Sequence, residues 1–175
     1  MCKQISRKYS APRFVFWTSK VSIGLRRSFE WFGSVFKRFE GLVRRYLAGA
    51  LDAGTGRLTW VKSDRKNSLL FIALLRKLAG CNPKAEVIHM VLDNFKIHES
   101  KAARAAVKEL NGRVALHFLP PYCPDDNKIE RVWLDVHGNV TRNHRCAEMP
   151  ELMANVESYL RNRNNRTERT VRRAA

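Results

Sequence analysis

Residues 87–133 read VIHMVLDNFKIHESKAARAAVKELNGRVALHFLPPYCPDDNKIERVW. The run from Val87 to Leu92 is apolar at five of its six positions, which is typical of a central strand buried on both faces. The segment 100–110 is expected to form a helix, and 114–119 a second strand. A loop with three prolines follows, and then a helix at 128–140. Strands and helices that alternate in this way predict an α/β fold.

The rest of the chain is expected to complete one sheet and its covering helices. Apolar positions between Asn67 and Gly80 recur at helical spacing, which predicts a helix there. The turn-rich sequence DAGTG at 52–56 would join two strands as a hairpin. Hairpin-linked strands followed by alternating helices and strands imply a mixed sheet with helices on both faces. The remaining expected elements are strands at 14–17, 46–51 and 57–61 and a last helix at 150–161.

The charge of the chain is strongly basic. Its 33 Lys and Arg against 16 Asp and Glu give a formal charge of +17, which suits a polyanionic partner such as nucleic acid. No stretch approaches the roughly 20 apolar residues of a membrane-spanning helix, so no membrane partner is expected. The four cysteines are scattered without metal or redox spacing, as in a reduced cytoplasmic protein.

The sequence divides into three parts. The segment 1–45 is basic and contains the expected first strand, and 46–162 forms one α/β core. The tail at 163–175 is also basic, and it is expected to be disordered. Such a tail could contact phosphates or be a frayed terminus.

Two acidic residues stand where a phosphoryl-transfer site would need them. Asp93 directly follows the central strand, at the edge where such sheets place ligands, and Glu130 opens the helix at 128–140. Carboxylates at this edge would hold hard cations such as Mg²⁺. Both residues also have a structural interpretation. Asp93 could be a turn or cap residue, and Glu130 could form a capping box with Asn127.

The sequence LPPYCPDDNKIERVW at 119–133 closely resembles the signature of Asp-Asp-Glu transposases, in the insertion-sequence branch of the mariner-like superfamily. The proline-rich loop, the Asn three residues before Glu130 and the Trp three residues after it carry the resemblance. YLAGALDAGTGRLTWV at 46–61 and KNSLLFIALLRKL at 66–78 resemble the second and third strands and the first helix of that family. The likeness spans about 46–160. It implies a ribonuclease H-like fold, which agrees with the order of elements.

The resemblance implies that Asp93 and Glu130 are the second and third carboxylates of a catalytic triad that binds two Mg²⁺ or Mn²⁺ ions. In the family the first carboxylate ends the first strand, often as Asp followed by Glu. The matching residues here are Ser19 and Lys20. Serine is a weak neutral ligand, and the charge of a lysine repels a cation. We therefore expect the metal site to be crippled.

Two functions from different classes remain open. One is a DNA transposase catalytic domain, with metal-dependent strand cleavage and strand transfer in the transposition of an insertion sequence. For this function Asp52 or Glu30 could replace the missing carboxylate. The other is a noncatalytic basic DNA-binding remnant or regulator of a full-length transposase. The family has a helix-turn-helix region before the first strand, which this sequence lacks, so we expect a truncated or decayed copy. DNA and a homodimer or synaptic assembly are the expected partners.

Basic residues near the two carboxylates are expected to contact the DNA backbone. His98 could bind a phosphate or cap the next helix. His137, His144 and Cys146 lack the spacing of a zinc site, so we interpret them as ordinary surface residues. The residues expected to bind nucleic acid are Lys96, His98, Lys128, Arg131 and Arg142.

Overall fold

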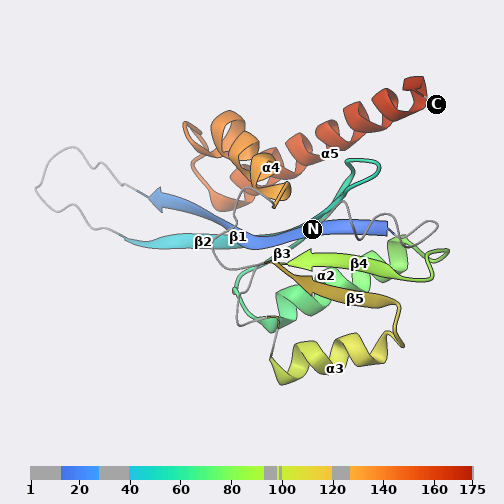
Figure 1. Cartoon of the computed structure of the whole chain (residues 1–175). Helices are drawn as coiled ribbons and strands as arrows, with labels where there is room; N and C mark the ends of the chain where they lie inside the picture. Colours follow the sequence, from blue (N-terminus) through green and yellow to red (C-terminus); the bar gives the residue numbers. More distant parts are fainter. Residues whose placement is uncertain (1–12, 28–39, 93–97, 99, 120–126, 175) are drawn as a thin grey trace, which may run out of the picture.

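The computed structural model contains one mixed sheet with helices on both of its faces (Figure 1). The residues that the structure describes are 13–27, 40–92, 98, 100–119 and 127–174, with the backbone path alone at 13–27, 40–43 and 174. The strands are β1 (Arg13–Arg27), β2 (Glu40–Asp52), β3 (Leu58–Ser63), β4 (Ile88–Leu92) and β5 (Val114–Phe118). The helices are α2 (Ser68–Cys81), α3 (Lys101–Glu109), α4 (Ile129–Val136), the π-helix η3 (His137–Thr141) and α5 (Met149–Ala174).

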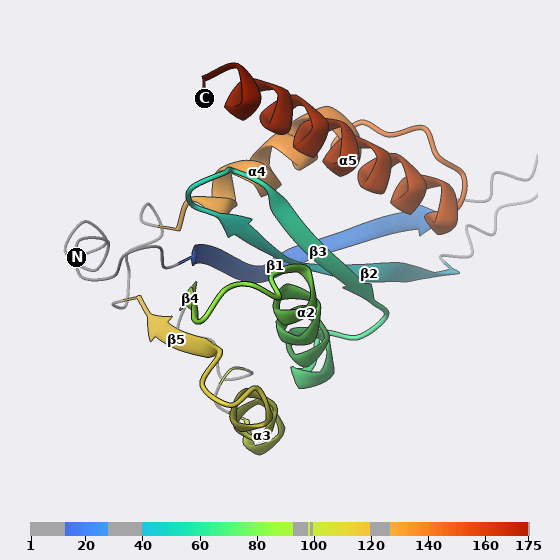
Figure 2. The ribbon, with the colours of Figure 1, turned by 90° about the vertical axis from the view of Figure 1, so that its right-hand side faces the viewer.

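The sheet has the strand order β3-β2-β1-β4-β5. β1, β2 and β3 are joined by antiparallel pairing, whereas β4 pairs in parallel with both β1 and β5. The helices α2 and α3 cover one face, and α4 and α5 lie on the other (Figure 2). The mixed sheet that the sequence predicts is confirmed.

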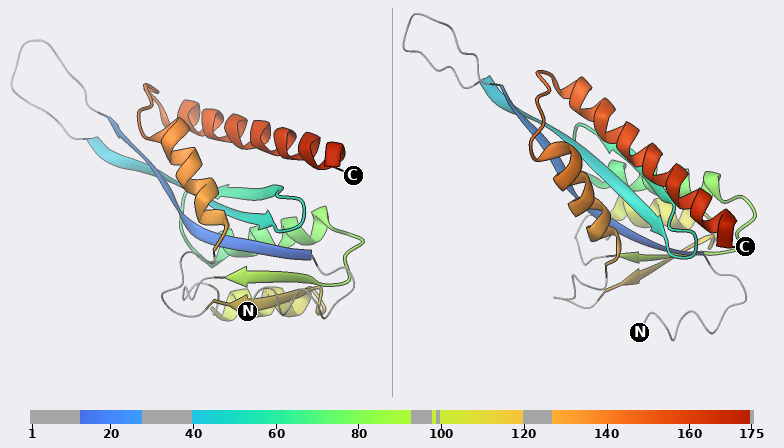
Figure 3. Two further views of the ribbon diagram at one scale, coloured as in Figure 1. Left: turned by 45° about the horizontal axis from the view of Figure 1, so that its top comes forward. Right: turned by 90° about the horizontal axis from the view of Figure 1, so that it is seen from above.

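The strands β1 and β2 are longer than expected. Their pairing extends from Val15, opposite Asp52, to Arg27, opposite Glu40. β3 pairs with β2 only along 46–51, so the far ends of β1 and β2 leave the sheet as a two-stranded ribbon (Figure 3). The sequence there shows no apolar period, and a ribbon outside the helix-covered part of a sheet requires none.

The helix α2 forms where its apolar spacing predicts it. Asn67 caps the helix, because its side chain accepts a hydrogen bond from the N–H of Leu70 at 3.2 Å. Leu74 and Leu75 are fully buried, and they pack in one cluster with Met90 of β4. This cluster is the core between the sheet and the layer of α2 and α3.

A second core lies between the sheet and the layer of α4 and α5. The helix α4 approaches β2 closely at Gly49, where an added Cβ would lie only 2.6 Å from Cζ2 of Trp133. A glycine is therefore required at this crossing. Trp133 is 5% exposed, so its side chain is part of this core.

The helix α5 corrects two expectations from the sequence. We expected it to end near Arg161 and a disordered tail to follow, but α5 continues to Ala174. Asn164 explains part of this length. Its Oδ1 accepts the N–H of Leu58 at 2.9 Å, and its Nδ2 donates to the carbonyl of the same residue at 2.8 Å. A contact between segments so distant in sequence leaves no local signal.

The helix expected at 128–140 is also corrected. It is α-helical only to Val136, and the π-helix η3 continues it to Thr141. Among the described helices, none combines the length and the apolar character that crossing a bilayer requires.

Candidate active site

The carboxyl end of β4 lies beside the middle of β1. The two strands are parallel, and Phe16 pairs with Val91. β4 ends one residue later, while β1 continues. Ser19 follows Phe16 by three residues, and Asp93 follows Val91 by two. Ser19, at the position of the family's first carboxylate, and Asp93, at the position of the second, therefore follow neighbouring strands. They follow them at the edge where such sheets place ligands. Asp93 itself lies outside the described residues.

A β-bulge interrupts β1 at the first-carboxylate position. From Thr18 to Val21 β1 advances by three residues, while its partner β2 advances by two, from Gly49 to Leu47. The extra residue falls within the pair of positions that replaces the first carboxylate. Bulges of this kind occur next to active sites because they redirect a side chain. No glycine or proline in the sequence marks this one.

The first turn of α4, which contains Glu130, lies beside the same stretch of the sheet. Cδ1 of Ile129, the preceding residue, lies 3.4 Å from where a Cβ on Gly49 would be, and Gly49 pairs with Thr18, directly before Ser19. Glu130 is half-buried. Among the residues that the structure describes, no ion pair or hydrogen bond occupies its carboxylate. This carboxylate is therefore available to a ligand.

The alternative interpretation of Glu130, a capping box with Asn127, does not hold. The N–H of Glu130 bonds to the backbone carbonyl of Asn127 at 3.0 Å and not to its side chain. Asn127 is only 5% exposed, and the residue before α4, Lys128, makes no side-chain cap. The Asn127 side chain is buried and does not cap α4. The side chain of Glu130 therefore has no capping role at the start of this helix.

His98 is a packing residue, and neither role expected for it holds. Its side chain is 1% exposed, and its ring meets Phe71 of α2 edge-on, with the centroids 4.7 Å apart. The cap of α3 is Ser100, whose Oγ accepts the N–H of Ala103 at 3.1 Å. A side chain buried to this extent does not offer a DNA phosphate a contact surface.

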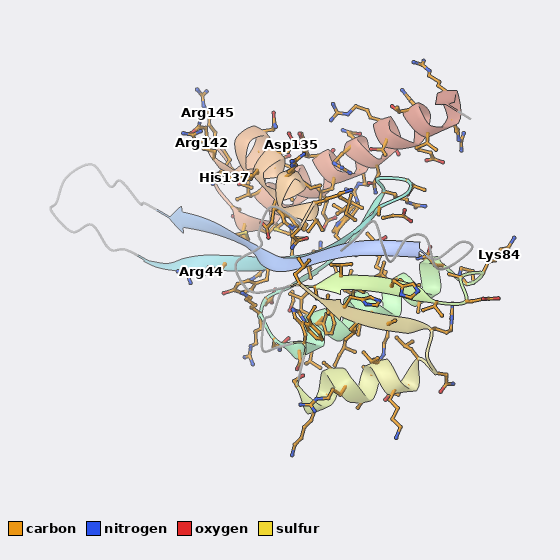
Figure 4. The ribbon with its side chains drawn as sticks, viewed as in Figure 1. Arg44, Lys84, Asp135, His137, Arg142 and Arg145 are labelled. Atoms are coloured by element: carbon orange, nitrogen blue, oxygen red, sulfur yellow. The ribbon has the colours of Figure 1, made fainter. Side chains whose placement is uncertain are left out.

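The other residues expected to bind nucleic acid are not gathered at one point. Lys128 and Arg131 are exposed and flank Glu130 in sequence. Arg142 is exposed as well, and it lies with Arg145 at the connection between α4 and α5 (Figure 4). Arg142 follows the far end of α4 and η3 from Glu130, so the structure does not bring these two together. Lys96 lies outside the described residues.

Asp52 does not replace the missing carboxylate. Its Oδ1 accepts the N–H groups of Gly54 and Thr55, both at 2.9 Å, which makes it the turn residue that the sequence predicts. Asp52 also pairs with a β1 residue four positions before Ser19. That separation is about 13 Å along a strand. Glu30, the other candidate, lies outside the described residues.

The donors at this place do not fit a pair of divalent cations. Such a pair needs several carboxylate oxygens that bridge and hold the ions. β1 supplies Ser19 and Lys20, which leaves Asp93 and Glu130 as the acids. The described residues contain no group of three or more His, Cys, Asp or Glu placed to hold one metal ion.

A histidine pair on the sheet has no signature in the sequence. Nδ1 of His89 in β4 lies 2.9 Å from Nε2 of His117 in β5, and His89 is 7% exposed. One ring must donate this hydrogen bond and the other must accept it, because two imidazolium rings would place two N–H donors against each other. Burial, and then the charge of His117, lower the pKa of His89 below its ordinary value. No local motif links residues 28 positions apart.

We expect the free energy of unfolding to fall as the pH drops below about 6.5, where the unfolded histidine takes up a proton. The stability from neutral His89 is fully present above that pKa and is lost as the pH falls through the lowered pKa of the folded state. Urea denaturation between about pH 8 and pH 5 measures this loss, which His89→Asn should reduce. His137→Asn, at an exposed histidine, is the matched control. An unchanged pH dependence in His89→Asn would refute this role.

Comparisons with known proteins identify the family. Residues 40–153 match the family described as DDE superfamily endonuclease. A Shigella sonnei protein, "Insertion element IS630 uncharacterized 39 kDa protein", is 38% identical over 115 residues, which are 66% of this chain and 33% of that protein. The chain thus spans about a third of the length of this curated relative.

Solved structures share the fold. The Mos1 transposase, in its paired-end complex with the left transposon end, matches 90% of this chain and 50% of its own, with a TM-score of 0.62 and 15% identity. A chain of the simian T-cell lymphotropic virus intasome in complex with PP2A regulatory subunit B56 gamma matches 77% of this chain and 46% of its own, with a TM-score of 0.50 and 14% identity. The expected ribonuclease H-like fold is confirmed. The chain belongs to the DDE superfamily endonucleases.

Proposed function

We propose that this chain is the catalytic domain of a DNA transposase and that its site faces DNA phosphodiester bonds. The observation that carries the proposal is the convergence of three chain segments at one sheet edge. These are the bulge of β1, the end of β4 and the first turn of α4, with Glu130 unpaired among the described residues. The presence of a transposon end in the Mos1 complex supports DNA as the partner.

The family generally uses divalent metal ions, which activate a water or a 3′ hydroxyl for attack on phosphorus. Asp93 and Glu130 are two of the three carboxylates that such a site would need. Ser19 supplies no charge, and Lys20 supplies a charge of the wrong sign. We therefore propose that the native chain binds DNA at this edge without cleaving it. Ser19 and Lys20 also favour a role as a noncleaving regulator of a full-length transposase.

Nicking of supercoiled plasmid in Mg²⁺ or Mn²⁺ tests this proposal. The native chain should nick no faster than the chain with Asp93→Asn, since neither has a complete set of ligands. Native nicking that Asp93→Asn abolishes would overturn the proposed loss, and it would show that another group supplies the first ligand.

A further inference from the structure

The outward face of the C-terminal half of α5 carries a dense group of arginines. At 3.6 residues per turn, seven exposed positions fall within an arc of about 140° on this face. Two of them are Asn162 and Asn165. The other five, which we name the α5 arginine face, are Arg161, Arg166, Arg169, Arg172 and Arg173.

Acidic residues offset little of this charge. Residues 161–173 contain six Arg and one Glu, a formal charge of +5. Arg161 pairs with Glu157 at 3.5 Å and Arg172 with Glu168 at 2.8 Å. These arginine side chains are 60% and 77% exposed, and such exposed pairs are weak. Within the described chain, Arg169 and Arg173 form no ion pair.

The α5 arginine face is held in place by contacts that other residues of the same helix make. Asn164 bonds both backbone groups of Leu58 in the edge strand β3. Arg163 donates to the carbonyl of Gly56 at 3.0 Å, and Tyr159 donates to Asp135 at 2.7 Å. These contacts anchor the helix on the β2–β3 turn and on the segment that contains α4. The arginines are therefore presented on an anchored helix, and binding a ligand costs less ordering entropy than it would for a disordered tail.

The arrangement favours a long polyanion over a membrane surface. From Arg161 to Arg173 the helix rises about 18 Å, whereas a duplex carries a phosphate every 3.4 Å or so along each strand. A helix that lies in a membrane surface needs an apolar face turned to the lipid. The arc that bears the α5 arginine face contains only Arg and Asn in this half of the helix.

We propose that the α5 arginine face binds the phosphates of duplex DNA, as a contact separate from the candidate active site. The inference rests on the proposed function for the choice of DNA. It concerns a part of the chain beyond the family match, which ends at residue 153. Leu58, which Asn164 of α5 contacts, pairs with Leu51 of β2. Leu51 is two residues along β2 from Gly49, where α4 crosses the strand. By strand geometry, Leu58 therefore lies about 8 Å from Gly49.

The test compares two variants of equal charge in binding to a short duplex of arbitrary sequence. The first is Arg166→Gln, Arg169→Gln and Arg173→Gln, along one helical stripe. The matched control changes three exposed lysines away from the α4 and α5 layer. Both variants lower the formal charge from +17 to +14. The control substitutions are Lys84→Gln, Lys101→Gln and Lys108→Gln.

The measured quantity is the slope of log binding constant against log salt concentration. Three lost phosphate contacts should reduce its magnitude by about 2.7, at about 0.9 per contact. A rise from about 50 to 200 mM salt would then weaken the arginine variant about 40-fold less than the native chain. The lysine variant should keep the native slope. Matching thermal unfolding of all three chains would show that the changes act on binding.

Three results would overturn the inference: no duplex binding by the native chain, an unchanged slope in the arginine variant, or an equal decrease in the lysine variant. Native binding to phosphatidylserine vesicles as tight as to the duplex, at the same salt, would instead assign the surface to a membrane. Native duplex binding with an unchanged slope in the arginine variant would overturn this inference and leave the proposed function standing, whereas no duplex binding by the native chain would contradict both.

Discussion

The chain carrying Ser19→Asp and Lys20→Glu is expected to nick supercoiled plasmid DNA in Mg²⁺ or Mn²⁺ at least about 100-fold faster than the native chain. Loss of an outer-shell partner alone costs a metal site about 10–100-fold, and here a direct ligand is missing. Lys20 adds a repulsion that near a protein surface reaches about 4 kcal/mol for two unit charges at 4 Å. The double substitution restores the family's Asp-Glu pair on a bulge that the fold already provides.

Two further variants decide whether the restored chemistry belongs to this site. Glu130→Gln, added to the double substitution, should remove the gained nicking, because it takes away a carboxylate from α4. Thr18→Asp in the native chain is the matched control for position, since it adds an acid one residue before the bulge. Equal nicking by Thr18→Asp, or none from the double substitution, would show that the site differs from the one described.

Gly49→Ala is expected to lower the free energy of unfolding by about 1–3 kcal/mol, the usual cost of overpacking a core. The new Cβ would lie 2.6 and 2.8 Å from two ring carbons of Trp133, and Trp133 is buried with little room to move. For a chain of this size each kcal/mol corresponds to about 2–4 °C in Tm. Thermal and urea unfolding measure the loss.

Gly80→Ala is the control for Gly49→Ala, because nothing lies within 4 Å of a Cβ at that position. Gly80 is helical, so alanine should stabilise the chain by about 0.5–1 kcal/mol. In a Trp133→Phe background, the cost of Gly49→Ala should shrink, since the smaller ring does not reach the new methyl group. An equal cost in both backgrounds would mean that the crossing of α4 and β2 does not depend on this contact.

The sequence predicted the elements whose signals are local. The apolar spacing between Asn67 and Gly80 corresponds to α2, and the apolar run before Asp93 is β4, in which all five residues are buried. The features it did not predict depend on distant partners. The β1 bulge exists only relative to β2, and the length of α5 reflects its bonds to Leu58 and Gly56.

The candidate site was also predictable only where its sequence signals are local. Spacing around Glu130 identified its helix and its family signature, but the same spacing also fitted a capping box that does not form. The choice between the two required the burial of Asn127, which no local pattern reports. His98 was judged from its closeness to Asp93 in sequence, whereas its ring packs on Phe71.

We propose that one sheet edge retains a metal-competent scaffold that lacks only the carboxylate at position 19. A titration with Mn²⁺, monitored by calorimetry and by electron paramagnetic resonance, tests this proposal without relying on cleavage. We expect weak Mn²⁺ binding by the native chain, binding at least about 10–100-fold tighter after Ser19→Asp and Lys20→Glu, and loss of that gain when Glu130→Gln is added. Tight binding by the native chain, or a gain that survives Glu130→Gln, would contradict this proposal.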